Sequence, residues 1–308
     1  MNIYTNSDIT LVPALFIIFL NILFGANAVA IKLTLNGMGP FTTAGARFAI
    51  AAVAIACWAF FTHRSFKIKK DQLVPLLIIS ILFTIQLSLF YLGLVKTLVS
   101  RGVLIVNLLP FIVLFLSHFF IPGDRITIRK LLGIAMGFVG VAFIFGSSQA
   151  ISRSARSGDF ILFAAVFLWS CNTVYIKRII HNFAPFQLVL YPMIFSVPLF
   201  LLQGLLWDAP MVIRLDTTVL GALAYQSLVT AAFGFVAWNT LLQKYGAGNL
   251  HSFVFVMPVS GVLLSGLILN DPITANILFA LVLITTGIIM VHVKPGKPTF
   301  TLPPGRGL

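Results

Sequence analysis

The stretch NAVAIK at residues 27–32 precedes Pro40-Phe41, and the similar stretch NTVYIK at residues 172–177 precedes Pro185-Phe186. Each residue of the second set lies 145 positions after its counterpart in the first. Both sets span the end of one long apolar segment and the start of the next. A repeat of this length indicates two structurally related halves.

Apolar segments fill nearly the whole chain, and most have about the 20 residues that a helix needs to cross a bilayer. We expect transmembrane helices at ten places: residues 11–33, 40–61, 73–95, 100–120, 128–146, 158–180, 185–207, 217–242, 247–269 and 274–293. The sequence therefore predicts an all-α integral membrane protein, with ten transmembrane helices arranged as two inverted five-helix repeats.

The inversion follows from the odd number of helices in each half, because the second half must then enter the membrane from the opposite side. Inverted halves can exchange conformations and expose a central site to each side in turn. We expect the first repeat at residues 11–146 and a polar, serine-rich linker at 147–157. The second repeat is expected at 158–293, and a flexible cytoplasmic tail at 294–308.

Composition supports a lipid environment, since 59% of the 308 residues are hydrophobic and only 9% are charged. A soluble domain has nearer a quarter of charged residues. The net charge of +13 comes from cations in short loops, where they orient transmembrane helices. Because no basic patch with interleaved aromatic residues occurs, we expect no nucleic-acid partner.

The distribution of Lys and Arg predicts the orientation. With the N-terminus inside, thirteen of these residues fall in inside loops and six in outside loops. The positive-inside rule then favours cytoplasmic termini at both ends of a multi-pass protein of the cell inner (plasma) membrane. We interpret residues 11–33 as a retained helix rather than a signal peptide, because no Lys or Arg precedes Leu11 and the run is too long.

No motif indicates catalysis. The chain has no His-Glu metal motif, no Gly-rich phosphate loop and no Ser nucleophile elbow. Cys57 and Cys171 lie in apolar segments without His or Cys at metal-ligand spacing. We therefore expect no catalytic residues, no metal and no cofactor, and we do not expect an enzyme.

Polar side chains inside the predicted spans are the candidate functional residues, because each is costly in lipid unless it faces a partner or a wet cavity. Arg47, in the predicted helix at 40–61, could contact an anion or carboxylate or form a gate. The structural alternative is that it caps a neighbouring helix end, pairs with backbone carbonyls or extends toward the interface. Asn27 and Asn172 occupy matching positions in the two halves, and either could bind substrate or join helices.

The predicted helix at 158–180 carries Trp169 and Asn172, which share a face at i, i+3 spacing and favour a cavity. Tyr225 could line that cavity or anchor its helix at the interface. No acid lies near the centre of a predicted helix, and Asp159 at the start of 158–180 comes closest. Ion coupling commonly uses a buried carboxylate, so this absence favours facilitated diffusion or exchange and disfavours polycationic substrates.

Several motifs resemble one known family. The stretch FGANAVAIK at residues 24–32, followed by Pro40 and Arg47-Phe48, resembles a pattern of the drug/metabolite transporter superfamily, in its ten-helix type with two EamA domains. The Gly-rich segment at 133–140 and the run from Tyr91 through Pro110 to Gly123-Asp124 are also similar to it. Three departures, which argue against equal use of the two halves, are Phe24 in place of Trp, Asp124 in place of Glu, and Pro192 where the offset would put an Arg.

The resemblance covers residues 11–293 and implies a central cavity between the halves. It also implies a secondary transporter or exporter of small organic metabolites, such as amino acids or related compounds, that works by alternating access across the inner membrane. Its partners would be a small-molecule substrate and the lipid bilayer, and a monomer would suffice. The candidate substrate-binding residues are Asn27, Arg47, Tyr91, Asn107, Trp169, Asn172, Tyr225 and Asn239.

Two alternatives remain open from the sequence. A nucleotide-sugar or phosphorylated-sugar exchanger of the same superfamily would use Lys and Arg against phosphate. A membrane-embedded enzyme or receptor would belong to another functional class.

Overall fold

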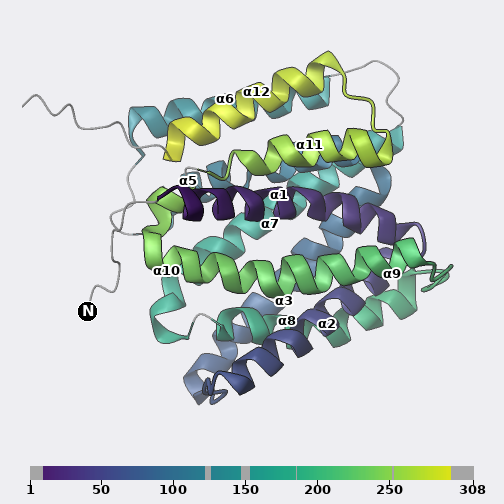
Figure 1. The fold of residues 1–308 in the computed structure, drawn as a ribbon, viewed down its shortest axis with the longest axis vertical. Helices are drawn as coiled ribbons and strands as arrows, with labels where there is room; N and C mark the ends of the chain where they lie inside the picture. Colours follow the sequence, from purple (N-terminus) through teal and green to yellow (C-terminus); the bar gives the residue numbers. More distant parts are fainter. Residues whose placement is uncertain (1–9, 122–125, 147–152, 185, 252, 293–308) are drawn as a thin grey trace, which may run out of the picture.

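A computed structural model describes residues 10–121, 126–146, 153–184, 186–251 and 253–292, which are almost entirely helical (Figure 1). The first half contains α1 (Leu11–Leu35), α2 (Pro40–Phe61), α3 (Lys70–Lys96), α4 (Val99–Val106), α5 (Leu109–Phe120) and α6 (Ile128–Gly146). The second half contains α7 (Arg153–Ile179), η1 (Ile180–Asn182), α8 (Gln187–Trp207), α9 (Thr217–Ala224), η2 (Tyr225–Gly234), α10 (Phe235–His251), α11 (Val256–Leu269) and α12 (Ala275–His292).

The helices have the length and composition of membrane spans. Within the described ranges, eight helical segments are long and apolar enough to cross a bilayer, and fewer than half of the residues in each are buried inside the protein. The apolar helices α11 and α12 are shorter, so the predicted all-α membrane class is confirmed but the count of ten spans is not. Exposed apolar side chains such as Leu11, Val53 and Phe61 form a surface suited to lipid.

Local sequence explains where several helices begin and end. Pro40 starts α2, where its missing N–H costs nothing because the first turn has no acceptor for it. The Asp216 carboxylate accepts a hydrogen bond from the Val219 N–H at 2.9 Å and caps the start of α9. Asn270, with φ of 56°, ends α11 in the left-handed conformation common at helix ends.

Proline explains the main errors in the predicted helices. Residues 100–120 form no continuous helix, since α4 ends at Val106 and α5 begins at Leu109. Pro110 has no N–H to donate back into the preceding turn, so the helix breaks there. The helix expected at 247–269 begins instead at Val256, close before the matching Pro258, and α10 runs on to His251.

Two other helices start earlier than expected. Helix α3 begins at Lys70 because the Gln72 side chain accepts the Lys69 N–H at 2.9 Å and caps it. Helix α7 begins at Arg153, so residues 153–157 of the predicted linker are helical. The rest of that linker and the predicted tail lie outside the described residues, and the domain division stays a prediction.

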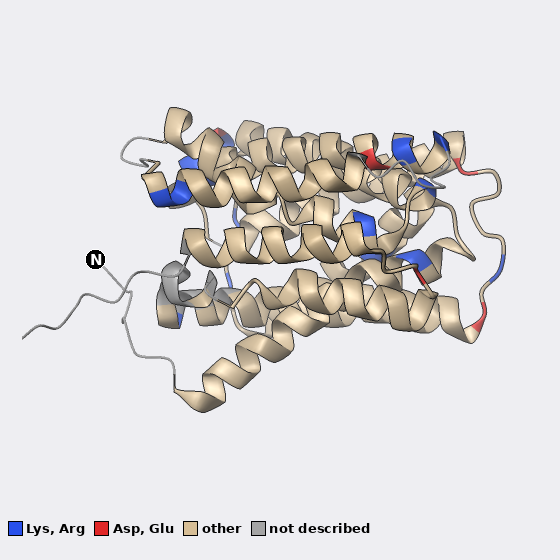
Figure 2. Ribbon diagram, turned by 90° about the horizontal axis from the view of Figure 1, so that it is seen from above, with Lys and Arg blue, Asp and Glu red and all other residues tan. Residues whose placement is uncertain are grey.

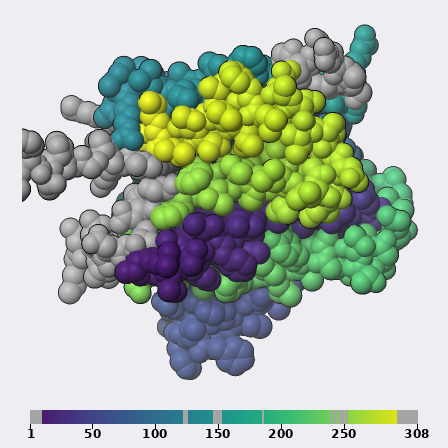
Figure 3. Space-filling view, turned by 45° about the horizontal axis from the view of Figure 1, so that its top comes forward, coloured from purple at the N-terminus to yellow at the C-terminus, as the bar shows by residue number. Residues whose placement is uncertain are grey.

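The packing of the helices is pseudo-twofold. Helix α2 packs against its counterpart α8, and α6 packs against its counterpart α12 (Figure 1). Helix α1 packs against α11 and η2, while its counterpart α7 packs against α4, α5 and α3. Figure 3 shows α1, in purple, beside the yellow-green α11 on one face of the molecule. Contacts of the first half therefore have equivalents in the second.

The two halves run in opposite directions. Near the end of α1, Lys32 Nζ donates to the carbonyls of Val95 and Thr97, at 3.2 Å and 3.1 Å, where α3 ends. Thr97 Oγ1 in turn donates to Asp159 Oδ1 at 2.6 Å, near the start of α7. The end of α1 and the start of α7 thus share one end of the bundle, as predicted for inverted repeats. We call it the Asp159 end, and the opposite end, where α1 and α3 start, the Gln72 end.

Small residues let helices of the two halves approach closely. A Cβ atom added at Gly25 of α1 would lie 2.1 Å from Ser260 Oγ and 2.8 Å from the Met257 carbonyl oxygen of α11. The backbone oxygen cannot rotate away, so this contact between the halves requires glycine. At Gly221 of α9, by contrast, an added Cβ would meet nothing within 4 Å.

We expect Gly25→Ala to destabilise the protein by about 1–3 kcal/mol, because it overpacks the α1–α11 contact. The matched variant Gly221→Ala should leave stability unchanged or slightly raised, since Ala favours helix over Gly. Melting temperatures of both purified variants in detergent measure the difference. Equal melting temperatures would contradict the close approach of α1 and α11.

Candidate functional site

Arg47 of α2 is buried between the halves. Its side chain is only 9% exposed, and its guanidinium faces α3 and η2. Nη1 donates to Tyr91 Oη at 3.3 Å, and Nη2 donates to Thr230 Oγ1 at 3.5 Å. The guanidinium carbon also lies 5.1 Å from the ring centre of Phe48. Arg47 therefore neither caps a neighbouring helix nor extends to the interface.

Hydrogen bonds continue from these two hydroxyl groups. Tyr91 Oη donates to Gln226 Oε1 at 3.0 Å, and Gln226 Nε2 donates to Thr34 Oγ1 at 2.8 Å. Thr230 Oγ1 lies 2.8 Å from Asn27 Oδ1 and can donate to it. The connected side chains come from both halves, and we call them the central network: Asn27, Thr34, Arg47, Tyr91, Gln226 and Thr230.

The second half contributes to the central network from a π-helix. Gln226 and Thr230 lie in η2, a ten-residue π-helical segment between α9 and α10. Gln226 and Thr230 are four residues apart and so lie on nearly one face, which here points at α1, α2 and α3. Such segments are rare and occur frequently at functional sites.

Arg47 has only neutral partners among the described residues. The described acids lie near the two ends of the bundle (Figure 2). None of them is a hydrogen-bond or ion-pair partner of Arg47 within the described residues: Asp71, Asp159, Asp208, Asp216 and Asp271. Arg47 Nε has no hydrogen-bond partner. The centre of the protein thus holds a buried cation without a counterion in the part of the chain that the structure describes.

A second polar pair lies on the other side of α3. Asn172 Nδ2 of α7 donates to Gln86 Oε1 at 3.3 Å, while Asn172 Oδ1 has no partner. One turn further along α3, Phe90 packs edge-on against Trp169, with ring centres 6.3 Å apart. Gln86 and Phe90 share the α7 side of α3 because they are four residues apart, whereas Tyr91 faces α2 and η2.

The remaining predicted residues lie elsewhere. Asn107 sits at the break between α4 and α5, where Nδ2 donates to the Val103 carbonyl at 2.7 Å and Oδ1 has no partner. Tyr225 Oη donates to the Leu23 carbonyl at 2.8 Å and ties η2 to α1. Asn239 belongs to α10, but its side chain lies outside the described part of the chain.

Of the predicted set, Asn27, Arg47 and Tyr91 therefore meet in one network, while Asn172 and Trp169 form a separate group. The prediction omitted Thr34, Gln86, Gln226 and Thr230. In the sequence, each of these four residues is a polar side chain within an apolar segment. That pattern does not indicate which helices pack together, so it could not assign the four residues to one site.

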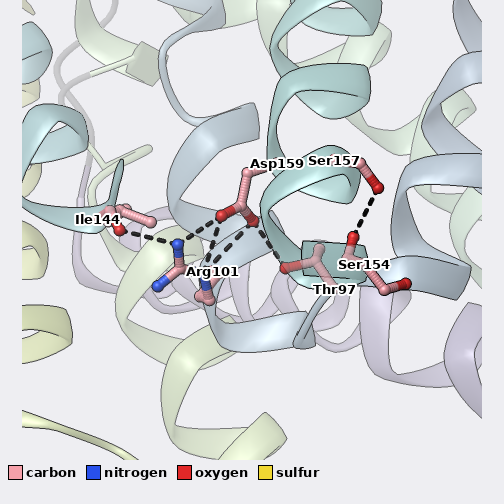
Figure 4. A network of polar contacts seen from close by, with 6 residues as sticks. All are labelled: Thr97, Arg101, Ile144, Ser154, Ser157 and Asp159. Atoms are coloured by element: carbon pink, nitrogen blue, oxygen red, sulfur yellow. Dashed lines mark hydrogen bonds and ion pairs between the residues drawn. The ribbon is translucent and has the colours of Figure 1, made fainter. Parts of the chain in front are cut away.

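An ion pair joins the halves at the Asp159 end (Figure 4). Arg101 Nε donates to Asp159 Oδ1 at 3.3 Å and to Oδ2 at 3.1 Å, and Nη2 also contacts Oδ2. The same Nη2 donates to the Ile144 carbonyl at 2.7 Å. Both charged side chains are buried, at 3% and 0% exposure, so each depends on the other.

Two further acids of the second half bind the first half at this end. Asp208 Oδ2, after α8, accepts the Thr42 N–H at 2.7 Å and the Thr42 hydroxyl at 2.8 Å. Asp271 Oδ2, after α11, accepts the Ser100 N–H at 2.9 Å. We call Asp159, Asp208 and Asp271 the acidic latch.

The Gln72 end is joined by neutral groups instead. Gln187 Nε2 donates to the Lys67 carbonyl at 3.0 Å, and Gln72 donates to the Asn182 carbonyl. Tyr191 also donates to a carbonyl of the loop between α2 and α3. The halves are therefore linked at both ends, by different chemistry.

A cavity of about 590 Å³ opens at the Asp159 end. Its wall is mainly apolar and includes Leu35, Phe41, Leu92, Trp207 and Asp208. None of its lining residues belongs to the central network. This cavity lies beside the acidic latch and does not open onto Arg47.

The EamA-like transporter family matches residues 11–146 and 156–293, which cover both halves. The protein belongs to this family. The resemblance found in the sequence is thereby confirmed, and so is the two-repeat fold. Membership makes the protein a multi-pass membrane transporter of small molecules of the drug/metabolite transporter type, and not an enzyme.

Relatives of this EamA-like transporter match along most of their length. It is 28% identical over 277 residues to the probable amino-acid metabolite efflux pump of Escherichia coli (strain K12), covering 87% of this chain and 90% of that protein. It is 25% identical over 280 residues to the uncharacterized transporter YoaV of Bacillus subtilis (strain 168), covering 89% and 94%. One solved crystal structure, at 18% identity, shares the fold with a TM-score of 0.67 over 90% of this chain and 97% of the other.

We expect Asp159→Asn to destabilise the transporter by about 3–5 kcal/mol, because Arg101 is left buried without its counterion. The combined variant Arg101→Leu/Asp159→Leu should recover part of that loss, since it buries no charge. Thermal unfolding in detergent measures both effects.

The matched control is Arg214→Gln, which removes the exposed Arg214–Asp216 ion pair and should cost about 0–1 kcal/mol. A melting temperature for Asp159→Asn as high as that of the control would contradict the assigned role of the buried pair.

Proposed function

We propose that this EamA-like transporter exports small organic metabolites, specifically amino acids or related compounds, across the inner membrane by alternating access. The main observation that supports this proposal is the central network, in which a buried cation and several neutral polar groups lie where the two inverted halves meet. Binding sites of transporters built from inverted repeats lie at that position. The names of the Escherichia coli and Salmonella typhimurium relatives support amino-acid metabolites as substrates.

Alternating access assigns a role to each end of the bundle. Opening the Asp159 end requires the acidic latch to release Arg101, Thr42 and Ser100. Opening the Gln72 end requires the bonds from Gln72 and Gln187 to break. Each half would rock against the other about the central network, which stays within the membrane.

The proposed orientation puts both termini in the cytoplasm and the Asp159 end outside. Most Lys and Arg in the loops then lie on the cytoplasmic side, as the positive-inside rule requires. The partners are the small-molecule substrate and the bilayer. One chain contains both halves of the site, so a monomer is sufficient for the cycle.

Exchange of nucleotide sugars or phosphorylated sugars is a weaker candidate. A phosphate ester carries close to two negative charges near neutral pH. The central network offers one cation, Arg47, among the side chains that the structure describes. A single guanidinium matches the single charge of a carboxylate better.

Proteoliposomes containing the purified protein test the function directly. We expect uptake or release of amino acids or related compounds from a mixed metabolite pool, read by mass spectrometry against protein-free liposomes. Counter-exchange from liposomes preloaded with sugar phosphates tests the second candidate. Uptake of no member of the pool above the protein-free level would overturn the proposal.

A reversible cross-link tests alternating access. In a Cys57→Ala/Cys171→Ala background, Thr42→Cys and Asp208→Cys put two thiols where side chains of the two halves now touch. A short bifunctional thiol reagent should abolish transport by holding the Asp159 end closed, and its reductive cleavage should restore transport.

The control pair Arg214→Cys/Asp216→Cys lies within the second half and is exposed. The same reagent should leave transport by this control essentially unchanged. Full transport by the cross-linked Thr42/Asp208 pair would show that the Asp159 end need not open.

A further inference from the structure

We propose that Arg47 recognises a carboxylate of the transported compound, so that the substrate class is small molecules with a single carboxylate. The inference rests on the proposed transport function and assigns the chemistry of its central site. It draws on three features of the central network: the unused donors of Arg47, the absence of a counterion, and the direction of the surrounding hydrogen bonds.

Arg47 has donor capacity to spare. A guanidinium carries five N–H groups in a planar fork. Within the part of the chain that the structure describes, the Arg47 guanidinium makes two contacts to oxygen, at 3.3 Å and 3.5 Å, and its Nε makes none. A guanidinium bonded to a carboxylate makes shorter bonds of about 2.7–2.9 Å, often two in parallel. The present partners therefore leave most of the fork available.

The charge of Arg47 also lacks compensation. A buried cation without a counterion is strongly unfavourable, and more so within a bilayer. The three acids of the latch are already bound, Asp159 to Arg101, Asp208 to Thr42 and Asp271 to Ser100. Within the described residues no carboxylate is left for Arg47. A substrate carboxylate would supply the missing negative charge.

The direction of the hydrogen bonds permits this exchange. Both hydroxyl groups next to Arg47 have other acceptors for their protons: Gln226 Oε1 for Tyr91, and Asn27 Oδ1 for Thr230. A carboxylate can displace the two hydroxyl oxygens from Arg47 while those bonds remain. Binding then creates no unsatisfied donor, which would otherwise reduce the affinity.

The same features define the rest of the substrate. The central network holds no acid, so it offers nothing to pair with a polycation. The neutral oxygens of Asn27, Tyr91 and Thr230 can accept hydrogen bonds from an amine, and the nearby Phe48 ring suits an apolar body. Amino acids and simple carboxylic acids meet this description.

The test compares L-amino acids with their primary amides, which keep size and shape but lack the carboxylate. Each compound is added to the purified full-length protein in detergent, and its dissociation constant is obtained from the rise in melting temperature. The same pairs are then used as competitors of uptake in proteoliposomes. We expect the amides to bind at least about tenfold more weakly than the acids.

Variants locate the effect at Arg47. Arg47→Gln should remove the preference for acid over amide, and Arg47→Lys should restore part of it, because Lys keeps the charge but not the fork. The matched control is Ser88→Ala on α3, which removes a partly buried hydrogen bond to Gln203 of α8 outside the central network. This control should keep the full preference.

Three outcomes would overturn the proposal: amides that bind wild type as well as acids, acids that give no rise in melting temperature, or Arg47→Gln with an undiminished preference. If Arg47→Gln fails to fold, the dissociation constants of acids and amides for the wild-type protein still test whether a carboxylate is recognised. If acids and amides are taken up equally well, the proposed transport function stands, but the proposed recognition of a carboxylate by Arg47 is rejected. Binding of acids without any transport would reject the proposed function instead.

Discussion

In the hydrocarbon core of a bilayer no bulk water satisfies a polar group, and this constraint governs the polar side chains of the membrane-spanning helices. Lys32 donates to the last carbonyls of α3, and Arg101 donates to the Ile144 carbonyl near the end of α6. Both cations thus satisfy backbone groups that a helix end leaves open. Among the residues that the structure describes, Arg47 contacts no such group, and its partners are the Tyr91 and Thr230 hydroxyls and the Phe48 ring.

The sequence predicts the parts of the fold that depend on local chemistry. The bounds expected for 40–61 and 128–146 match α2 and α6, because proline, polar loops and apolar length decide them. The repeat offset and the odd helix number predict the inversion that the Lys32–Thr97–Asp159 contacts establish. The helices expected at 100–120 and 247–269 run through the breaks before Pro110 and Pro258, because a proline can either break a helix or be tolerated in its first turn, and the neighbouring backbone decides which occurs.

The candidate site was predicted only in part, for a physical reason. A polar residue in an apolar helix signals that it has a partner, but the partner lies on a helix far away in the sequence. Tyr91 and Gln226 meet across 135 positions, and their contact depends on how α3 and η2 lie in the folded bundle. The pairing of Arg101 with Asp159 likewise depends on how α4 and α7 pack, so the charges appeared as unrelated residues of two segments.

The two halves share one arrangement of helices, but they contribute different charged side chains to the contacts between them. The buried cation lies in the first half, and Pro192 takes the place of its counterpart in the second. The acidic latch belongs wholly to the second half, and its bonds end on the first. In the proposed alternating access, opening the Asp159 end would bring charged groups toward water, and their hydration would offset part of the lost attraction. The neutral bonds of the Gln72 end would gain less from hydration, so the two proposed openings would differ in free energy although the two halves are related by pseudo-symmetry.

Helices α2 and α3 connect the central network to the Asp159 end of the bundle. Thr42 and Arg47 lie five residues apart on α2, about 7.5 Å along the helix axis. One binds the Asp208 carboxylate, and the other faces the central network. Tyr91 and Thr97 connect the same two regions through α3. In the proposed function, a substrate that pairs with Arg47 would therefore act on a helix whose first turn is bonded to Asp208, and a shift of α2 at the centre would also change its contact at the Asp159 end.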